Sequence, residues 1–555
     1  MSSDRLIYLP LGGAGEIGMN AYVYGYGKPG KERLILVDLG VTFPDMDTTP
    51  GVDLIMPDIA WLAKNRDRLE AVFITHAHED HVGAVAHLYD RLGAPVYARA
   101  FTANIARRKM GEHGHPDEAV TTVSAWPEMT EAGPFQVGFV PLSHSIPESS
   151  GLVIDTPAGR IVHSGDFKLD ENPIVGEAFD RKLWEEVAKP GVKVFACDST
   201  NVMSRHPGRS ESSVGGEIEK LVGTAEGVFV ATTFASNVAR VLTLAEAGQR
   251  AGRSVCLLGR AMRRMIEAAI ETGVLADFPR TVSPEDARNI PRENLMLIVT
   301  GSQGERRAAS AQLANGKYQG IELKEGDMFL FSSKTIPGNE RGVLRIVNQL
   351  SEKGVDVIDD SSGLYHVSGH ANRPDLETMH EILQPEILVP MHGEHRHLRE
   401  HVKLADKRGI KGILAVNGMM IDLTGKAPKV AEYIDTGRTY LDGSVKYGAM
   451  DGIVRDRIRM ALNGHVMVNV ILDEEDAPLG EPWCELRGLA EQGSSNAPLV
   501  DVLEADLDQF LGRADDKTLA DDDKLEEQLR RITRQTTQGE IGKKPEVTVV
   551  ISRLS

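Results

Sequence analysis

One short run of the chain has the residue types and spacing of a metal-binding motif. The run HAHEDH, His76–His81, directly follows the apolar run AVFIT and precedes the helix-like run GAVAHLYDRL. Residues two apart at the end of a strand project to the same side, so His76 and His78 can share one metal ion. Asp80 and His81, on the turn into a helix, can address a second ion. An isolated His-x-His pair is common, but the full H-x-H-x-D-H pattern favours a metal site.

Three further candidate ligands follow later apolar runs. His144 lies in PLSHSIPESSG, Asp166 in RIVHSGDFKLD and His392 in ILVPMHGEH. Each one alone is more commonly a turn residue or a hydrogen-bonded histidine. Because each stands at the end of a strand-like run, we expect the three to complete the ligand set, with the Asp166 carboxylate bridging two ions.

The run Gly13-Ala-Gly15-Glu-Ile-Gly18 matches the G-x-G-x-x-G pattern of dinucleotide-binding folds. Asp38 lies at about the distance downstream at which those folds carry the acid that binds the ribose. That site needs a helix that begins at the third glycine, because the pyrophosphate sits on a helix N-terminus. The run that follows, MNAYVYGYGKPGKERL, alternates like a strand. We therefore interpret the glycines as a tight turn near a polar site.

The elements that must position these residues show two rhythms. Over about residues 6–165, short apolar runs alternate with Gly, Pro, Asp and His turns, which indicates strands. Over about residues 208–369, strands alternate with helices, which is typical of a parallel α/β sheet. A helix, the strand EILVPMH, a helix around 394–408 and the strand GILAV are expected next. Since another histidine of the metal-ligand type follows a strand at His392, the middle unit is interpreted as an insertion into the first domain.

The end of the chain has the pattern of a small α+β domain. From about Tyr447 we expect the strands HVMVNVIL and PWCELRGLA, the helices LVDVLEADLDQFLG and KLEEQLRRITRQ, and the strand EVTVVISRL. This region carries no set of catalytic residue types. It is interpreted as an oligomerisation or partner module, with a plain structural appendage as the alternative.

Composition limits the class of protein. The 555 residues are 41% hydrophobic and 26% charged, which is typical of a soluble globular protein with several domains. The three cysteines, Cys197, Cys256 and Cys484, are too scattered for a disulfide framework and indicate a reducing compartment, so a cytoplasmic location is expected. The chain shows no signal-peptide pattern and no apolar run long enough to span a bilayer, so no membrane partner is expected.

Net charge argues mildly against nucleic acid as a partner. The formal charge is −19, whereas phosphate binding is usually driven by clustered Lys and Arg. The charge is uneven, however, because residues 250–264 are basic and Asp521, Asp522 and Asp523 form an acidic run. Bound divalent cations would also reverse the local field. Net charge therefore does not exclude nucleic acid.

Taken together, the motifs resemble those of the metallo-β-lactamase superfamily: an Asp after a strand, H-x-H-x-D-H, a His and a bridging Asp. Here these are Asp38, His76–His81, His144 and Asp166, over about the first 200 residues. His392, reached after a long insertion, resembles the β-CASP branch, which comprises nucleic-acid hydrolases.

That branch adds an acidic residue, here Asp198 in VFACDSTN, and a histidine, here His370 in YHVSGHANR. The loop DLGVTFPDMDTTPGVDLIMPD, the segment HVSGHA and the small last domain resemble the ribonuclease J family over essentially the whole chain.

The resemblance implies an α/β fold: an αββα metallo-β-lactamase sandwich, an inserted parallel α/β β-CASP domain and a small α+β C-terminal domain. The sandwich is expected in two parts, 1–208 and 373–447. The insertion is expected at 209–372, a linker at 448–464 and the C-terminal domain at 465–555.

For function, the resemblance implies a metal-dependent RNA phosphodiester hydrolase that leaves 5′-phosphate and 3′-hydroxyl ends. It implies a 5′-to-3′ exoribonuclease with endoribonuclease activity on single-stranded, preferably 5′-monophosphorylated RNA, acting in rRNA processing and mRNA decay. Two divalent ions, with zinc expected first and manganese or magnesium as alternatives, lower the pKa of a shared water that attacks phosphorus as hydroxide. A homodimer or homotetramer and an RNA-decay assembly are further expectations.

The ligand assignment follows the same resemblance. Asp38 is interpreted as orienting a histidine ligand by accepting its free N–H. His370 is the candidate acid for the leaving 3′-oxygen, with Asp198 holding its ring and raising its pKa. Without the family, His370 could equally be a phosphate ligand. We assign His76, His78 and His144 to the first ion, Asp80, His81 and His392 to the second, Asp166 to both, and Asp80, His370 and Asp198 to catalysis.

A pocket for the RNA 5′ phosphate is also implied. Helix N-termini and backbone N–H groups beside glycine suit an anion. Without the family, Ser236 would be interpreted as only an N-cap. The turn Gly301–Gly304 is a further candidate for contact with the RNA backbone, which the sequence neither favours nor excludes. The pocket residues are Ser236, Asn237, His366, Ser368 and Gly369.

Other functions remain open from the sequence. The same metal set serves small-molecule hydrolases such as thioesterases and lactamases, although the α/β insertion would be superfluous for a small substrate. A β-CASP DNA nuclease is a closer alternative, because contacts to a 2′-hydroxyl do not show in sequence spacing. A non-catalytic RNA-binding scaffold is a third alternative, against which the intact ligand set argues.

Overall fold

The computed structural model describes residues 4–554. One compact unit comprises the chain up to Thr42 together with Met56–Arg438, and a second comprises Phe43–Ile55 together with the chain from Thr439. All the candidate site residues lie in the first unit. Among the described residues, no helix combines the length and the apolar character needed to cross a membrane.

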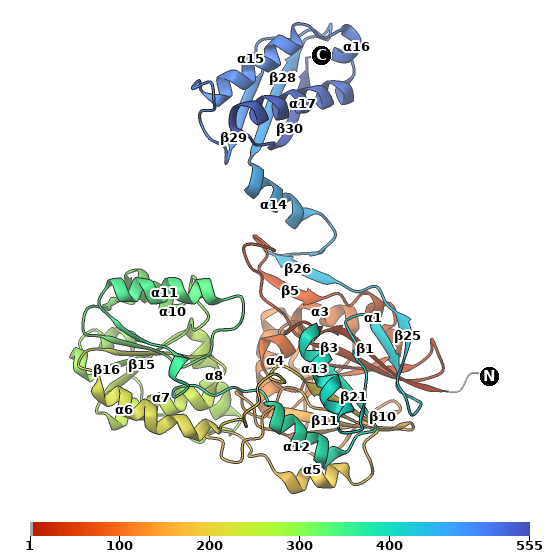
Figure 1. Cartoon of the computed structure of the whole chain (residues 1–555), viewed down its shortest axis with the longest axis vertical. Coiled ribbons are helices and arrows are strands. Elements are labelled where there is room, and N and C mark those ends of the chain that lie inside the picture. Colours follow the sequence, from red (N-terminus) through yellow and green to blue (C-terminus); the bar gives the residue numbers. More distant parts are fainter. Residues whose placement is uncertain (1–3, 555) are drawn as a thin grey trace. The chain divides into compact units, whose positions relative to one another are not determined.

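The first unit contains a sandwich of two β-sheets, as the sequence predicts (Figure 1). Side chains such as Tyr8, Phe73, Phe139 and Val389 fill the space between them. The eight-stranded sheet runs β25 (Lys429–Tyr433), β24 (Met419–Asp422), β1 (Arg5–Gly12), β3 (Ala21–Gly27), β4 (Arg33–Val37), β6 (Leu69–Phe73), β7 (Val96–Ala98) and β8 (Val120–Thr122). The seven-stranded sheet runs β23 (Lys411–Gly412), β21 (Ile387–Met391), β13 (Val194–Asp198), β12 (Gly159–His163), β11 (Ser150–Thr156), β10 (Phe135–Pro141) and β9 (Thr130–Ala132).

Helices cover the sandwich. On the outer face of the seven-stranded sheet, Trp184, Leu376 and Leu404 pack against Val153 and Phe195. These residues explain the strands' composition, because strands buried on both faces must be apolar on both. The helices of this layer are α5 (Arg181–Ala188), α12 (Arg373–Leu383) and α13 (His395–Asp406). In the chain, α1 (Ala60–Lys64) precedes β6, α2 (Glu79–Val82) and α3 (Val85–Leu92) follow β6, and α4 (Ala100–Glu112) follows β7.

The inserted region is a five-stranded parallel sheet with helices on both faces, as predicted (Figure 1). Two separate apolar clusters lie on its two faces. The strand order is β15 (Ser254–Leu258), β16 (Leu295–Val299), β14 (Phe229–Thr232), β19 (Met328–Phe331) and β20 (Asp356–Ile358). The helices are α6 (Gly215–Thr224), α7 (Val238–Arg250), α8 (Arg260–Glu271), α9 (Pro284–Ala287), α10 (Ala309–Asn315) and α11 (Glu340–Glu352).

The second unit ends in the predicted small α+β domain. Its three-stranded sheet carries two helices on one face, joined by an apolar cluster that includes Val468, Leu503 and Leu529. Buried and more exposed positions alternate along β28 (His465–Leu472), which shows that one face of the sheet is covered. The elements are β29 (Trp483–Arg487), β28 (His465–Leu472), β30 (Glu546–Arg553), α15 (Leu499–Leu511), α16 (Asp516–Leu519) and α17 (Asp522–Ile541), preceded by β26 (Arg438–Asp442) and β27 (Val445–Gly448).

Two local expectations differ from the structure. The segment expected as a linker contains the helix α14 (Ile453–Asn463), bounded by Gly452 and Gly464, which both have positive φ. The run GILAV, expected as a strand, pairs as one only at Gly412, within β23 (Lys411–Gly412), whereas Ala415 beyond it is buried by side-chain packing. Apolar content alone does not distinguish these two ways of burying a run.

Candidate metal centre

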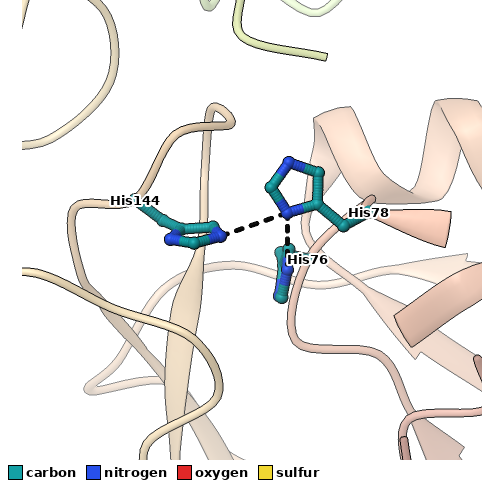
Figure 2. A group of neighbouring side chains, drawn as sticks. All are labelled: His76, His78 and His144. Atoms are coloured by element: carbon teal, nitrogen blue, oxygen red, sulfur yellow. Dashed lines mark hydrogen bonds between the residues drawn. The ribbon is translucent and has the colours of Figure 1, made fainter. Parts of the chain in front are cut away.

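Three histidines converge on one point. His76 and His78 lie between β6 and α2, and His144 follows β10. The Nε2 atoms of His76 and His144 each lie 3.1 Å from Nδ1 of His78 (Figure 2). Burial lowers the pKa of His78 to about 4 and holds the pKa values of the other two well below their ordinary range. Three neutral imidazoles that face one another offer lone pairs to a cation.

A second group combines carboxylates with histidines. Ligand-type atoms of Asp80, His81, Asp166 and His392 all lie within 4.8 Å of one another. Nε2 of His81 is 3.1 Å from Oδ2 of Asp166, and Nε2 of His392 is 3.2 Å from Oδ2 of Asp80. The same Asp166 oxygen is 3.9 Å from Nε2 of His76, in the histidine group. Asp166 therefore stands between the two groups, where the sequence places the bridge.

Charge in the second group is balanced by protons on the histidines. Burial alone would lower the pKa of His81, but the Asp166, Asp80 and Asp38 carboxylates raise it to about 10. Burial would likewise raise the pKa of Asp166, but His392 and His81 hold it well below its ordinary range. A divalent cation can replace those protons as the positive partner.

The donor set fits a divalent transition metal. Oδ1 of Asp166 is buried and has no hydrogen-bond partner among the described residues, although Nδ1 of His392 lies 3.0 Å away. A buried carboxylate oxygen without a partner is costly unless a cation or another donor satisfies it. Imidazole and carboxylate ligands together suit zinc or manganese better than calcium.

Strained and close-packed backbone aims these ligands. Asp38 has φ +61° and accepts hydrogen bonds from Thr75 N at 2.8 Å and from Nδ1 of His81 at 2.7 Å. His392 has φ +48°, and its N–H donates to Gly13 O at 2.7 Å. A non-glycine residue in this region costs energy that the surrounding contacts must offset. The first glycine of the G-x-G-x-x-G run thus supports a candidate ligand, and a strand, β3, follows the run.

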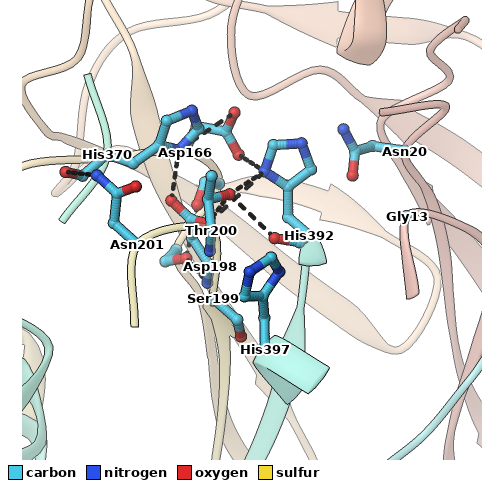
Figure 3. A network of polar contacts seen from close by, with 12 residues as sticks. Gly13, Asn20, Asp166, Asp198, Ser199, Thr200, Asn201, His370, His392 and His397 are labelled. Carbon is cyan, nitrogen blue, oxygen red and sulfur yellow. Dashed lines mark hydrogen bonds and ion pairs between the residues drawn. The ribbon is translucent and has the colours of Figure 1, made fainter. Parts of the chain in front are cut away.

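His370 and Asp198 form a pair beside the metal-type groups (Figure 3). Nδ1 of His370 lies 2.8 Å from Oδ2 of Asp198, at the end of β13. Thr200 holds the other oxygen of Asp198 through its N–H at 2.9 Å and its hydroxyl at 2.7 Å. Burial would lower the pKa of His370, but Asp198 raises it. The His370 ring centre is 5.1 Å from that of His144.

The segment around His370 also contacts a candidate ligand directly. Nδ1 of His144 donates to Gly369 O at 2.6 Å, which leaves Nε2 of His144 as the free ligand atom. An added Cβ at Gly369 would lie 2.7 Å from Oγ of Ser145, so this close approach requires glycine. Ser368 accepts from His370 N at 3.1 Å through its hydroxyl oxygen.

The other residues predicted for a phosphate pocket divide into two kinds. Asn237, not Ser236, is the N-cap of α7, and its side-chain oxygen accepts from Arg240 N at 3.0 Å. Nδ1 of His366 is buried with no hydrogen-bond partner among the described residues. Burial, followed by the positive charges of Arg240 and Lys334, lowers the pKa of His366 to about 3. His366 is therefore a neutral polar group in cationic surroundings.

Sequence patterns did not reveal several supporting residues. The amide of Asn20 donates to Asp80 O at 2.9 Å and lies 2.9 Å from Nε2 of His81. Asn201 donates to the Ser368 hydroxyl at 2.8 Å. Asn20 carries no spacing signal, whereas the polar run after Asp198 could have pointed to Asn201. In the turn Gly301–Gly304, the side chain of Gln303 bonds the neighbouring loop at Lys334 O and Ile336 N.

Comparisons with known proteins agree with this geometry. Residues 14–199 match the family described as "Metallo-beta-lactamase superfamily", and residues 364–415 match "Zn-dependent metallo-hydrolase RNA specificity domain". A solved structure of a protein of unknown function from Enterococcus faecalis shares the fold, with a TM-score of 0.52 and 17% identity over 75% of this chain and 100% of that chain. The sandwich and its donor set define a metallo-hydrolase of the metallo-β-lactamase superfamily with a β-CASP insertion.

Closer relatives specify the family. Residues 226–350 match "Ribonuclease J, beta-CASP domain" and residues 452–554 match "Ribonuclease J C-terminal domain". A "Ribonuclease J" of Sinorhizobium meliloti is 41% identical over 99% of this chain and 98% of its own length. One of Mycolicibacterium smegmatis is 35% identical over 90% and 89%. The chain belongs to the ribonuclease J family.

Proposed function

We propose that this protein is a metal-dependent ribonuclease that hydrolyses RNA phosphodiester bonds. The observation that carries the proposal is the convergence of seven His and Asp side chains, from distant parts of the chain, into two adjoining groups, with Asp166 of the second group 3.9 Å from His76 of the first. Membership of the ribonuclease J family supplies the substrate class.

We propose His76, His78 and His144 as ligands of one cation, and Asp80, His81 and His392 as ligands of a second, with Asp166 between them. When bound, two such cations lower the pKa of water and neutralise the charge of the scissile phosphate. Zinc is the first choice for this donor set, with manganese or magnesium as alternatives. Asp38 orients His81 by accepting its Nδ1–H.

His370 is proposed as the acid that protonates the leaving 3′-oxygen. Its Nδ1 faces Asp198, so its Nε2 is the atom left to carry a proton to the substrate. The His370 side chain is 22% exposed and that of Asp198 only 1%, which supports the imidazole, rather than the carboxylate, as the group that reaches substrate. Asp198 raises the pKa of His370, which favours the protonated form that an acid needs.

The 5′ phosphate of RNA is proposed to bind beside His366. The unpartnered Nδ1 of His366, with the positive charge of Lys334 among its surroundings, suits an anion. Ser236, Asn237, Ser368 and Gly369 complete the proposed pocket. Because Asn237 already caps α7, its contribution would come from the backbone rather than the side-chain oxygen.

Finer features remain part of the proposal. The enzyme would act 5′-to-3′ on single-stranded, 5′-monophosphorylated RNA, cut internally as well, and leave 5′-phosphate and 3′-hydroxyl ends, in rRNA processing and mRNA decay. We propose a homodimer or homotetramer, and a role in an RNA-decay assembly, in which the C-terminal domain at 465–555 takes part. A reducing cytoplasm is the proposed location, and the free cysteines Cys197, Cys256 and Cys484 are compatible with it.

The test supplies single-stranded RNA with a labelled 5′-monophosphate to the metal-loaded protein. Early release of labelled mononucleotides would support exonuclease action, and longer labelled fragments would support internal cutting. The Asp166→Asn variant serves as the inactive control. Uncut RNA together with rapid cleavage of a DNA of the same sequence, or of a thioester, would overturn the proposal in favour of another hydrolase.

A further inference from the structure

We infer that Arg240 positions the segment that recognises the RNA 5′ end, as the central residue of a buried ion network. This inference rests on the proposed function, because it concerns the pocket around His366. Arg240 lies in the first turn of α7 and is 0% exposed. Its Nε and Nη2 donate to the two carboxylate oxygens of Glu211 at 2.6 and 3.0 Å. The bidentate geometry fixes the plane of the guanidinium.

The remaining nitrogen of Arg240 holds backbone next to the pocket. Nη1 donates to Ser332 O at 3.0 Å, to the Ser332 hydroxyl at 2.9 Å and to Tyr365 O at 3.0 Å. The Ser332 hydroxyl donates to the same Tyr365 oxygen at 2.7 Å. Tyr365 immediately precedes His366. The guanidinium therefore fixes the chain one residue before the candidate phosphate ligand.

The other end of the network reaches the metal centre. Glu211 N donates to Oδ2 of Asp170 at 2.8 Å, and Nζ of Lys168 lies 2.9 Å from that oxygen. Lys168 N in turn donates to Ser143 O at 2.8 Å. Ser143 is adjacent to His144 and Lys168 is two residues after Asp166. These four side chains, Lys168, Asp170, Glu211 and Arg240, are called the tetrad below; it holds two positive and two negative charges.

The two histidines of the pocket segment are anchored differently. His370 is held by Asp198, and its N–H by the Ser368 hydroxyl. The Nδ1 of His366 has no hydrogen-bond partner among residues 4–554, and the backbone before it is held through Tyr365. A change at Arg240 should therefore displace His366 more than His370. We expect weaker recognition of the 5′ end before any loss of bond cleavage.

The test is the full-length, metal-loaded Arg240→Lys variant on two linear RNAs of one sequence, with either a 5′-monophosphate or a 5′-hydroxyl. Lysine keeps the charge but loses the planar fork. The 5′-phosphate preference, which is kcat/KM for the 5′-monophosphorylated RNA divided by kcat/KM for the 5′-hydroxyl RNA, should fall at least about tenfold. The fall should come from a higher KM for the phosphorylated RNA. The kcat on 5′-hydroxyl RNA should change less than about threefold, because His370 keeps its own anchors.

Arg253→Lys is the matched control. Arg253 is also a buried arginine of the inserted domain, and it donates to the carbonyl oxygens of Gly227 at 2.8 Å and Leu295 at 3.1 Å. The Arg253→Lys variant should have lower thermal stability but the wild-type ratio of kcat/KM for the two RNAs. A wild-type protein without 5′-phosphate preference would overturn the proposed pocket itself. An Arg240→Lys variant with the wild-type ratio, or an equal loss in Arg253→Lys, would overturn the positioning role alone.

Discussion

The metal centre and the tetrad are both buried and charged, and Asp166 and Lys168 are only two residues apart, yet they differ in one respect. In the tetrad, donors face acceptors: the guanidinium of Arg240 meets a carboxylate and two carbonyl oxygens. In the metal centre, the neutral imidazoles of His76, His78 and His144 face one another, with Nδ1 of His78 3.1 Å from Nε2 of each of the other two.

Whether buried donors and acceptors match distinguishes a structural network from a ligand site. A buried polar cluster whose donors and acceptors match needs nothing more, and it fixes the chain in one arrangement. A cluster of converging lone pairs is costly by itself and is explained by a cation that binds there. The variants below test this distinction, beginning with the one expected to have the largest effect.

Asp166→Asn should abolish activity and metal binding together. The amide removes the negative charge shared by both groups, so we expect kcat to fall at least about 10³-fold, which corresponds to about 4 kcal/mol of transition-state stabilisation. Single-turnover RNA cleavage and elemental analysis of the purified protein measure the two effects. Asp170→Asn is the matched control in the tetrad and should keep its metal. Equal metal loss in both variants would contradict the distinction.

His370→Ala should slow the reaction without releasing metal. Loss of a positioned acid typically lowers kcat about 10²- to 10⁴-fold. The seven proposed ligands remain in place, so the metal content should match that of the wild type. Stopped time courses under saturating RNA, together with elemental analysis, check both halves. An undiminished rate would remove His370 from the mechanism, and loss of metal would make it a ligand instead.

Glu211→Gln should destabilise the fold and spare the metal. The change leaves the fully buried Arg240 without its charged partner, which typically costs about 3–5 kcal/mol. Urea unfolding of the metal-loaded protein measures the free energy of unfolding. Stability within about 0.5 kcal/mol of the wild type would show that the tetrad is not held by this ion pair.

A buried imidazole pair provides the smallest and most selective test. Nε2 of His380 and Nε2 of His401 lie 3.1 Å apart, and burial lowers the pKa of His380 to about 4. The pKa of His380 is near 6.5 in the unfolded chain and about 4 in the folded chain, so protonation below pH 6.5 favours the unfolded chain. The free energy of unfolding therefore falls as pH drops below about 6.5.

Between pH 6.5 and 5 the loss from His380 should be about 1–2 kcal/mol. His380→Gln should flatten the dependence of the free energy of unfolding on pH by that amount. A variant whose pH dependence equals that of the wild type would show that His380 is not buried in its neutral form.

The convergence of the candidate ligands could be predicted because they stand at strand ends, where an apolar run and a following His or Asp are both visible in the sequence. His144 and His392 were proposed as ligands in this way, although they are 248 positions apart in the sequence. The parallel sheet followed from the alternation of strand-like and helix-like runs, whereas the sandwich was expected from the resemblance to the metallo-β-lactamase superfamily.

The remainder depends on contacts that no local pattern encodes. Arg240, in VARVLTLAE, has the spacing of an ordinary helical residue, and only the fold brings Glu211 to it. Asn20, immediately before β3, contacts His81 with no motif of its own. The helix α14 was missed because its charged run IVRDRIRMALN offers only a narrow apolar side.

The most direct test of the account is the location of metal in crystals of the purified protein, from anomalous scattering at the absorption edge of the metal found by elemental analysis. The account predicts two ions per chain, one among His76, His78 and His144 and the other among Asp80, His81 and His392, with Asp166 between them. Crystals of active protein with no anomalous peak at these residues would contradict it.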